Sequence, residues 1–244
     1  MRTNVKSKEY FEKFFELQLD DLHYYENSLK EGEVKEDRVM AIKSTIFLNS
    51  LHTVIAKYSY GENPKDLVNE FLTVITRLEQ GWDDEGATPE DDIHFDNYVV
   101  MLWMLSLGIL LDISNEDFNR IVTVLDKSNR KDFLFDYLIL FKTKNHLVTK
   151  KLTYEVYKPL FDICNSTEKS GVTEKLKIFL DKKWYKGMKR AYWYENHKSK
   201  ADTFFGYWSF ESGAIVKIFD LDDTSIKDSN FYPYDLVHWK NEKQ

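Results

Sequence analysis

Hydrophobic positions recur at helical spacing along most of the chain. In the first sixty residues, apolar side chains return every three or four positions in two long segments, which end near Gly32 and Gly61. Asn63 is then placed to cap a third helix, which begins at Pro64 and stops at Gly81. No part of the chain shows the sustained apolar and polar alternation of a surface strand between turn residues. The pattern predicts an all-α protein.

The helical pattern continues through the second half of the chain. An apolar segment from about Ile93 to Asp112 is followed by Ser114, a cap residue for a helix that runs to about Lys127. A polar stretch, Asp126–Lys131, separates this part from the rest. The remaining helices are expected at residues 131–142, 153–164, 173–185 and 203–219.

These segments predict a compact multi-helix bundle made of two helical halves that share a core. The polar stretch at Asp126–Lys131 lies near the middle of the chain, where two halves could meet. We therefore expect an N-terminal helical domain at residues 1–128 and a C-terminal helical domain at residues 129–244.

Composition narrows the class of protein. The chain has 244 residues, of which 43% are apolar, and only 9 glycines and 4 prolines, which suits long helices around a sizeable core. Its one cysteine, Cys164, allows neither an intramolecular disulfide nor a zinc site built from cysteines, as expected for a protein of the reducing cytoplasm. The first fifteen residues lack the apolar core of a signal peptide. The longest apolar run, Tyr98–Leu111, is shorter than the roughly 20 residues of a membrane helix, so no membrane association is expected.

Negative charge is concentrated in one part of the sequence. The formal net charge is −7, and no lysine or arginine occurs between Arg77 and Arg120. The acidic residues of this window are Glu79, Asp83, Asp84, Glu85, Glu90, Asp91, Asp92, Asp96, Asp112, Glu116 and Asp117. Such a local field favours a basic partner, because complementary charge accelerates encounter and selects among partners.

The candidate partner-binding surface lies at the start of this window. Trp82 directly precedes three acids, and a tryptophan beside carboxylates can anchor a protein interface. We call residues 82–92 the acidic segment. Its predicted partner-binding residues are Trp82, Asp83, Asp84, Glu85, Glu90, Asp91 and Asp92.

The stretch "DLDDT" near the C-terminus has the spacing of the phosphatases that use a nucleophilic aspartate. Asp220, Asp222 and Thr224 would be the nucleophile, the acid and base, and the threonine beside Mg²⁺. Only about twenty residues follow Thr224, which is too few for the strands of such an enzyme, and the preceding run has a helical period. These residues are expected to form the acidic exit of the last long helix.

A ribonuclease of the helical HEPN type is the alternative function. Arg190 and His197 have the spacing of its motif, in which histidine is the general base and arginine stabilises the phosphate. The polar residue that usually follows the arginine is Ala191 here, and the spacing by itself is common.

Basic and aromatic residues interleave between Lys182 and Lys200, a composition that can bind single-stranded nucleic acid. A pI near 5.5 and the local concentration of acidic residues oppose polyanion binding, so no direct nucleic-acid binding is expected. The six histidines show no metal-ligand spacing and no phosphate-binding glycine loop occurs. We expect no catalytic residue, metal or cofactor.

The sequence from Trp184 to Trp239 resembles the C-terminal domain of the PoNi proteins, the immunity partners of polymorphic nuclease effector (PoNe) toxins. Residues 1–128 are similar to the N-terminal domain of that family, though less distinctively. The elements that carry the C-terminal resemblance are "YWY" at 192–194, "HKS" at 197–199, "FGYWSFE" at 205–211, "LDD" at 221–223 and "YPYDL" at 232–236.

This resemblance implies an α-helical, non-enzymatic immunity protein of the cytoplasm. It would bind and neutralise a cognate secreted DNase toxin of the PD-(D/E)xK type and so protect the producing cell in bacterial competition. The aromatic family motifs are expected to define the fold rather than to touch the toxin. Together with the charge pattern, the resemblance predicts that the acidic segment masks a basic DNA-binding surface of the toxin.

Overall fold

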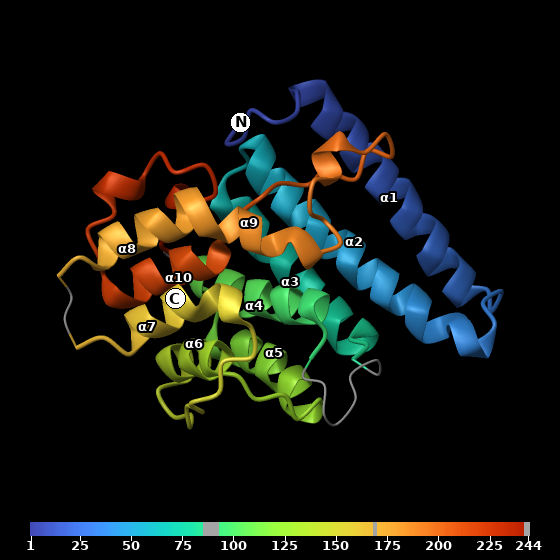
Figure 1. Cartoon of the computed structure of the whole chain (residues 1–244). Helices are drawn as coiled ribbons and strands as arrows, with labels where there is room; N and C mark the ends of the chain where they lie inside the picture. Colours follow the sequence, from blue (N-terminus) through green and yellow to red (C-terminus); the bar gives the residue numbers. More distant parts are fainter. Residues whose placement is uncertain (85–92, 168–169, 242–244) are drawn as a thin grey trace. The chain divides into compact units, whose positions relative to one another are not determined.

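The protein is helical throughout. The computed structural model describes residues 1–84, 93–167 and 170–241. Helices make up 67% of the chain and no strand occurs in these three ranges, which confirms the predicted all-α class (Figure 1).

The helices group into two compact units. Unit 1 comprises residues 1–85 together with 195–206, and unit 2 comprises residues 86–194 together with 207–244. The chain therefore returns once from unit 2 to unit 1 before it completes unit 2. The two units are defined by contacts in space, whereas the predicted domains, 1–128 and 129–244, are defined along the sequence. The domain division therefore stays a prediction.

Unit 1 is built on three long helices. Helix α2 packs against both of the others, and its residues Phe47, Leu51 and Ile55 lie in the core. The Ser7 hydroxyl accepts the Tyr10 N–H at the start of the first helix. The three helices are α1 (Lys8–Lys30), α2 (Val39–Tyr60) and α3 (Pro64–Gly81), with short 3₁₀ turns at Glu36–Arg38 and Asn196–Lys198.

The predicted ends of α2 and α3 are confirmed. Helix α2 stops at Gly61, whose φ of 112° is readily adopted only by glycine. The Asn63 side chain accepts the Lys65 N–H, and Pro64 occupies the first turn of α3. The segment Glu36–Tyr60 is long and apolar enough to cross a membrane by length and composition alone, since an 18-residue window within it has a mean hydropathy of 1.3. In the fold it is a helix of unit 1 that packs between α1 and α3.

Unit 2 is assembled around α4 (Phe95–Leu110). Every side chain from Tyr98 to Leu110 is buried, as predicted for a central core helix. Helices α5, α6 and α10 pack against it. The helices of this unit are α5 (Asn115–Lys127), α6 (Phe133–Thr143), α7 (Lys158–Cys164), α8 (Val172–Ile178), α9 (Tyr185–Gly187), α10 (Phe210–Phe219) and α11 (Tyr234–Val237).

Shorter turns complete unit 2. The 3₁₀ turns lie at Glu155–Tyr157, Met188–Arg190 and Thr224–Ile226. A π-helical turn, Phe179–Trp184, joins α8 to α9. Leu176, Leu180, Trp184 and Met188 are buried at a repeat of four residues. In an α-helix this repeat rotates by about 40° at each step, and a wider turn offsets the rotation and keeps these side chains in the core.

The prediction of one helix over residues 203–219 is wrong for its first seven residues. The helix begins at Phe210, and Gly206 has a φ of 130°, outside the right-handed helical region. Residues far away in the sequence form hydrogen bonds with the backbone of this segment. The Tyr10 hydroxyl donates to the Phe204 carbonyl (3.0 Å) and accepts the Phe204 N–H (2.7 Å), and the Ser59 hydroxyl donates to the Phe205 carbonyl (2.8 Å). These bonds hold residues 204–205 extended in unit 1.

The carboxyl group of Glu211 lies in the core of unit 2. Glu211 is 1% exposed, and its Oε1 accepts the Trp184 indole N–H (2.5 Å) and the Ser209 hydroxyl (2.8 Å). Burial raises the pKa of Glu211 to about 7, and the hydrogen bonds from Ser209 and Trp184 oppose this effect. Because folding raises the pKa of Glu211, protonation of this carboxyl group is coupled to folding.

We expect the stability of the protein to depend on pH through Glu211. The unfolded chain loses this proton near pH 4.5, whereas the folded chain keeps it up to about pH 7. The folded state binds more protons in this interval, so the free energy of unfolding falls as pH rises from about 4.5 to 7, by at most about 3 kcal/mol. Glu211→Gln should remove this contribution, as measured by urea denaturation at pH 5 and pH 8.

Glu116→Gln is the matched control, because Glu116 is exposed on α5. It should keep the pH dependence of the unmodified protein. An identical pH dependence in Glu211→Gln would show that Glu211 does not titrate in this interval.

Candidate functional site

The start of the acidic segment extends from the C-terminal end of α3. The Trp82 N–H donates to the Leu78 carbonyl and closes the last turn of the helix (2.9 Å). Asp83 and Asp84 follow in non-helical backbone and are partly exposed. The other predicted partner-binding residues, Glu85, Glu90, Asp91 and Asp92, lie outside the described residues.

Trp82 has a structural contact as well as an exposed edge. Its ring packs edge-on against Phe47 of α2, with centroids 6.4 Å apart and an interplanar angle of 71°. The side chain is partly rather than fully exposed. This contact fixes the direction in which the chain leaves α3, so Asp83 and Asp84 start from a defined position on unit 1.

Glycine at position 81 is required for this geometry. A Cβ atom at Gly81 would lie 2.3 Å from the Lys43 carbonyl oxygen and 2.5 Å from its carbon, both backbone atoms of α2. The end of α3 can approach α2 this closely only without a side chain. The approach brings Trp82 to Phe47.

Asp83 and Asp84 follow the C-terminal end of α3. The C-terminal end of a helix carries a partial negative charge, which basic side chains in the last turn usually balance. The last turn of α3 has no basic residue. Arg77, one turn earlier, donates to Glu26 (2.6 Å) and to the Ser50 hydroxyl (2.5 Å). Asp83 and Asp84 therefore add two carboxylates next to a helix end whose last turn has no basic residue.

The aspartates of the "DLDDT" stretch have three separate structural roles. Asp220 ends α10 in the left-handed conformation, with φ 49°. Asp222 accepts the N–H (3.1 Å) and hydroxyl (2.6 Å) of Thr224. Asp223 is buried and accepts the Tyr232 hydroxyl at 2.6 Å, and His238 Nε2 lies 3.1 Å from it. The helical exit is as predicted, and each carboxylate serves a turn or a core contact.

Arg190 and His197 do not share a helix. Arg190 ends the 3₁₀ turn Met188–Arg190, and its guanidinium lies over the Phe95 ring at 5.6 Å. His197 belongs to a separate 3₁₀ turn, and Glu195 between them has a φ of 58°. The regular helix on which the ribonuclease spacing depends is absent from residues 188–198.

Two of the five aromatic residues of the basic cluster, Trp184 and Trp193, are in the core, whereas Tyr192 is 45% exposed. Trp184 and Trp193 are each 1% exposed and stack at 5.8 Å, and Tyr185 stacks on Phe231 at 5.2 Å. The buried rings of Trp184 and Trp193 cannot stack on bases, which weakens the case for single-strand binding. The lysines between them are exposed.

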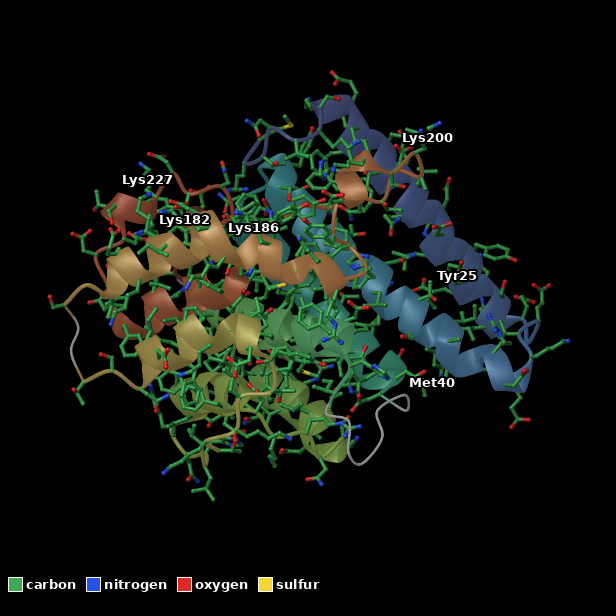
Figure 2. All side chains as sticks on the ribbon, viewed as in Figure 1. Tyr25, Met40, Lys182, Lys186, Lys200 and Lys227 are labelled. Carbon is green, nitrogen blue, oxygen red and sulfur yellow. The ribbon has the colours of Figure 1, made fainter. Side chains whose placement is uncertain are left out.

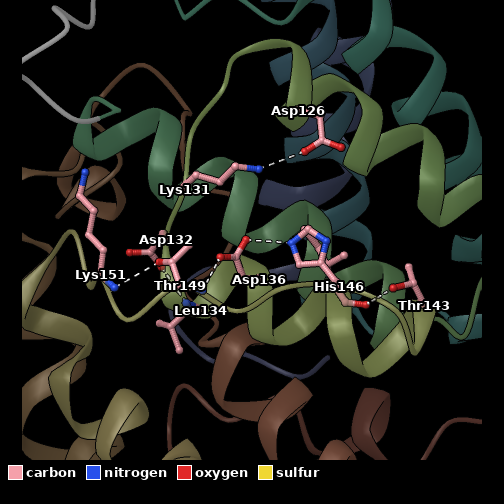
Figure 3. Close-up of polar contacts among 10 residues, drawn as sticks. Asp126, Lys131, Asp132, Leu134, Asp136, Thr143, His146, Thr149 and Lys151 are labelled. Atoms are coloured by element: carbon pink, nitrogen blue, oxygen red, sulfur yellow. Dashed lines mark hydrogen bonds and ion pairs between the residues drawn. The ribbon is translucent and has the colours of Figure 1, made fainter.

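Sequence reasoning missed two buried aspartates of α6 (Figure 3). Asp136 lies 2.9 Å from His146 Nε2 and accepts the Thr149 N–H at 2.8 Å. Asp132 caps α6 at Leu134 and accepts the Thr153 N–H at 2.7 Å. Burial raises the pKa of Asp132, and its hydrogen bonds oppose this. The two carboxylates fasten residues 144–153 to α6, and only Asp132, which directly precedes an apolar run, could have been recognised as a cap.

Comparison with known proteins decides the family. Residues 3–123 match the sequence profile described as PoNe immunity protein (PoNi), N-terminal, and residues 130–236 match that described as PoNe immunity proteins (PoNi), C-terminal. The chain belongs to the PoNi family. By family it is therefore an immunity protein of PoNe toxins, as the resemblance implied.

Two further comparisons concern curated proteins and solved structures. A search of curated proteins finds no match. Among solved structures, the PoNi chain is similar to "Protein PA2201 from Pseudomonas aeruginosa", with a TM-score of 0.70 and 15% sequence identity over 97% of this chain and 89% of that one. This likeness concerns the fold alone.

The PoNi motifs of the C-terminal half are largely buried. Tyr207, Trp208, Phe210, Asp223 and Tyr232 are each less than 10% exposed. The family-defining residues of unit 2 thus build its interior, in agreement with the expectation that they define the fold.

We expect Gly81→Ala to destabilise the protein by about 1–3 kcal/mol, because the added Cβ forces α3 away from the α2 backbone. Gln80→Ala, at an exposed neighbour in the same turn, should leave the free energy of unfolding within about 0.5 kcal/mol of the original value. Urea denaturation of both variants measures the difference. Equal stability of the two would mean that α3 can move from α2 at little cost.

Proposed function

We propose that this PoNi-family protein neutralises a cognate PoNe nuclease toxin of the PD-(D/E)xK type by masking its basic DNA-binding surface. The masking surface is the acidic segment, residues 82–92. In this proposal the protein works in the cytoplasm of the producing cell as a non-enzymatic DNase inhibitor and thereby serves bacterial competition. Its membership of an immunity protein family supports the general role.

The observation that carries the masking proposal is the position of Asp83 and Asp84 at the C-terminal end of α3. Asp83 and Asp84 follow the last turn of α3, which lacks a basic residue, within a window that has no lysine or arginine. A basic partner that docks here would place cationic groups beside these carboxylates and the negative end of the helix, which complements their charge. The Phe47–Trp82 contact holds the first carboxylates in place before the partner arrives, which lowers the ordering cost of association.

Charge also determines the kinetics of the encounter. A negative surface attracts a protein whose DNA-binding face is positive, and the same surface repels DNA. This attraction would accelerate the encounter of the inhibitor with the nuclease. Because this attraction is screened at physiological ionic strength, affinity depends on salt.

Neutralisation of the acidic segment should weaken toxin binding. We expect Asp83→Asn, Asp84→Asn, Asp91→Asn and Asp92→Asn in one chain to raise the Kd for the nuclease encoded beside its gene by about 100-fold or more. The salt dependence of the Kd should flatten in the same variant, because the screened charges are gone. Titration calorimetry at low and high salt measures both effects.

The matched control neutralises four exposed acids elsewhere, Glu33, Asp37, Glu174 and Asp228. It changes the net charge equally and should bind nearly as tightly as the original chain. If both quadruple variants lose the same affinity, only overall charge matters and the masking surface is assigned wrongly.

The ribonuclease alternative has its own test. We expect the purified protein to leave RNA intact, because Arg190 and His197 lie in separate turns divided by Glu195. RNA cleavage that disappears in His197→Ala would contradict the proposed non-enzymatic function.

A further inference from the structure

Unit 2 contains a hollow whose walls carry charge opposite to that of the acidic segment. The hollow has a volume of about 520 Å³. One wall is the start of α7 with the turn before it, residues 155–162, and the other is the junction of the π turn with α9, residues 182–187. Four lysines line it, Lys158, Lys182, Lys183 and Lys186. Lys182 and Lys186 lie about one turn apart on the second wall (Figure 2).

Packing of unit 2 produces this hollow. A Cβ atom at Gly187 would lie 2.1 Å from Val156 Cγ2, so the two walls meet at this glycine. On the inner side of the same segment, Trp184 is bonded to Glu211 in the core. Because Trp184 faces inward, Lys182, Lys183 and Lys186 are exposed on the outer side.

The lysines of the second wall are not neutralised. Lys158 pairs with Asp162 across one turn of α7. Within residues 1–84, 93–167 and 170–241, Lys182, Lys183 and Lys186 have no hydrogen-bond or ion-pair partner. Three like charges within five residues repel one another, and an anion between the walls relieves this repulsion.

We propose that this lysine-lined hollow binds an acidic segment of the toxin, which gives the complex a second charged contact of opposite sign. The proposal rests on the proposed function. Carboxylates of the bound segment pair with Lys182, Lys183 and Lys186. A volume of about 520 Å³ suits a short peptide segment with two or three side chains inside.

The walls favour a protein segment over nucleic acid. Glu155 and Asp162 lie on the first wall, where they repel a continuous phosphate backbone but can pair with a basic side chain that follows an acidic one. The rings of Trp184 and Trp193 are buried and offer no face on which bases could stack. The net charge of −7 also opposes a long polyanion.

The test reverses the charge of the second wall. One variant carries Lys182→Glu, Lys183→Glu and Lys186→Glu, and its control carries Lys150→Glu, Lys175→Glu and Lys227→Glu at exposed positions of the same unit. Both change the net charge equally. A third variant, with the three wall lysines changed to Gln, tests the site if charge reversal impairs folding, and thermal melting monitors all three.

Two ligands are titrated against each protein, the nuclease encoded beside this gene and a hexaglutamate peptide. We expect the wall variant to bind the nuclease at least 10-fold more weakly than the control, the Gln variant to lie between them, and the peptide to compete with the nuclease for the unmodified chain only.

Equal nuclease affinity of the wall variant and the control would overturn this inference and leave the proposed function intact. Binding of a single-stranded or duplex oligonucleotide that depends on the three lysines would also overturn it, since the occupant would be nucleic acid. An unmodified chain that does not bind the nuclease would remove the proposed function itself.

Discussion

Helix α4 has no polar face, and the construction of unit 2 depends on this constraint. Since every side chain from Tyr98 to Leu110 is buried, other helices must exclude water from all sides of it. Its C-terminal carbonyls also need partners. The Lys217 ammonium, from α10, donates to the Leu110 carbonyl (2.9 Å) and to the Trp239 carbonyl (2.7 Å). The C-terminal part of the chain is thus fastened to the end of the central helix.

Within the family motifs, this constraint distinguishes residues that build unit 2 from residues that could contact a partner. Glu211 and Asp223 have side chains that could act as catalytic groups. Both instead accept hydrogen bonds inside unit 2. Arg190 and Trp193 likewise contact other side chains of the unit. We propose that recognition uses two charged surfaces. One is the acidic segment after α3, and the other is the lysine-lined hollow of unit 2.

Local patterns made most of the helices predictable. Apolar spacing located α1 to α6, and the cap residues Asn63 and Ser114 marked helix starts that the structure confirms. Residues 203–209 were not predictable in this way, because Tyr10 and Ser59, far away in the sequence, bond their backbone. The lysine-lined hollow was equally invisible, since it depends on the π turn and on the meeting of Gly187 with Val156. Charge is visible in a sequence, whereas concavity arises from packing.

Masking of the DNA-binding surface is the central claim, and competition for the nuclease tests it most directly. A catalytically inactive form of the nuclease encoded beside this gene is bound to labelled duplex DNA, and the PoNi-family protein is added. The account predicts that the protein displaces the DNA and that the apparent Kd for DNA rises in proportion to the inhibitor concentration. A stable ternary complex of nuclease, inhibitor and DNA would contradict it.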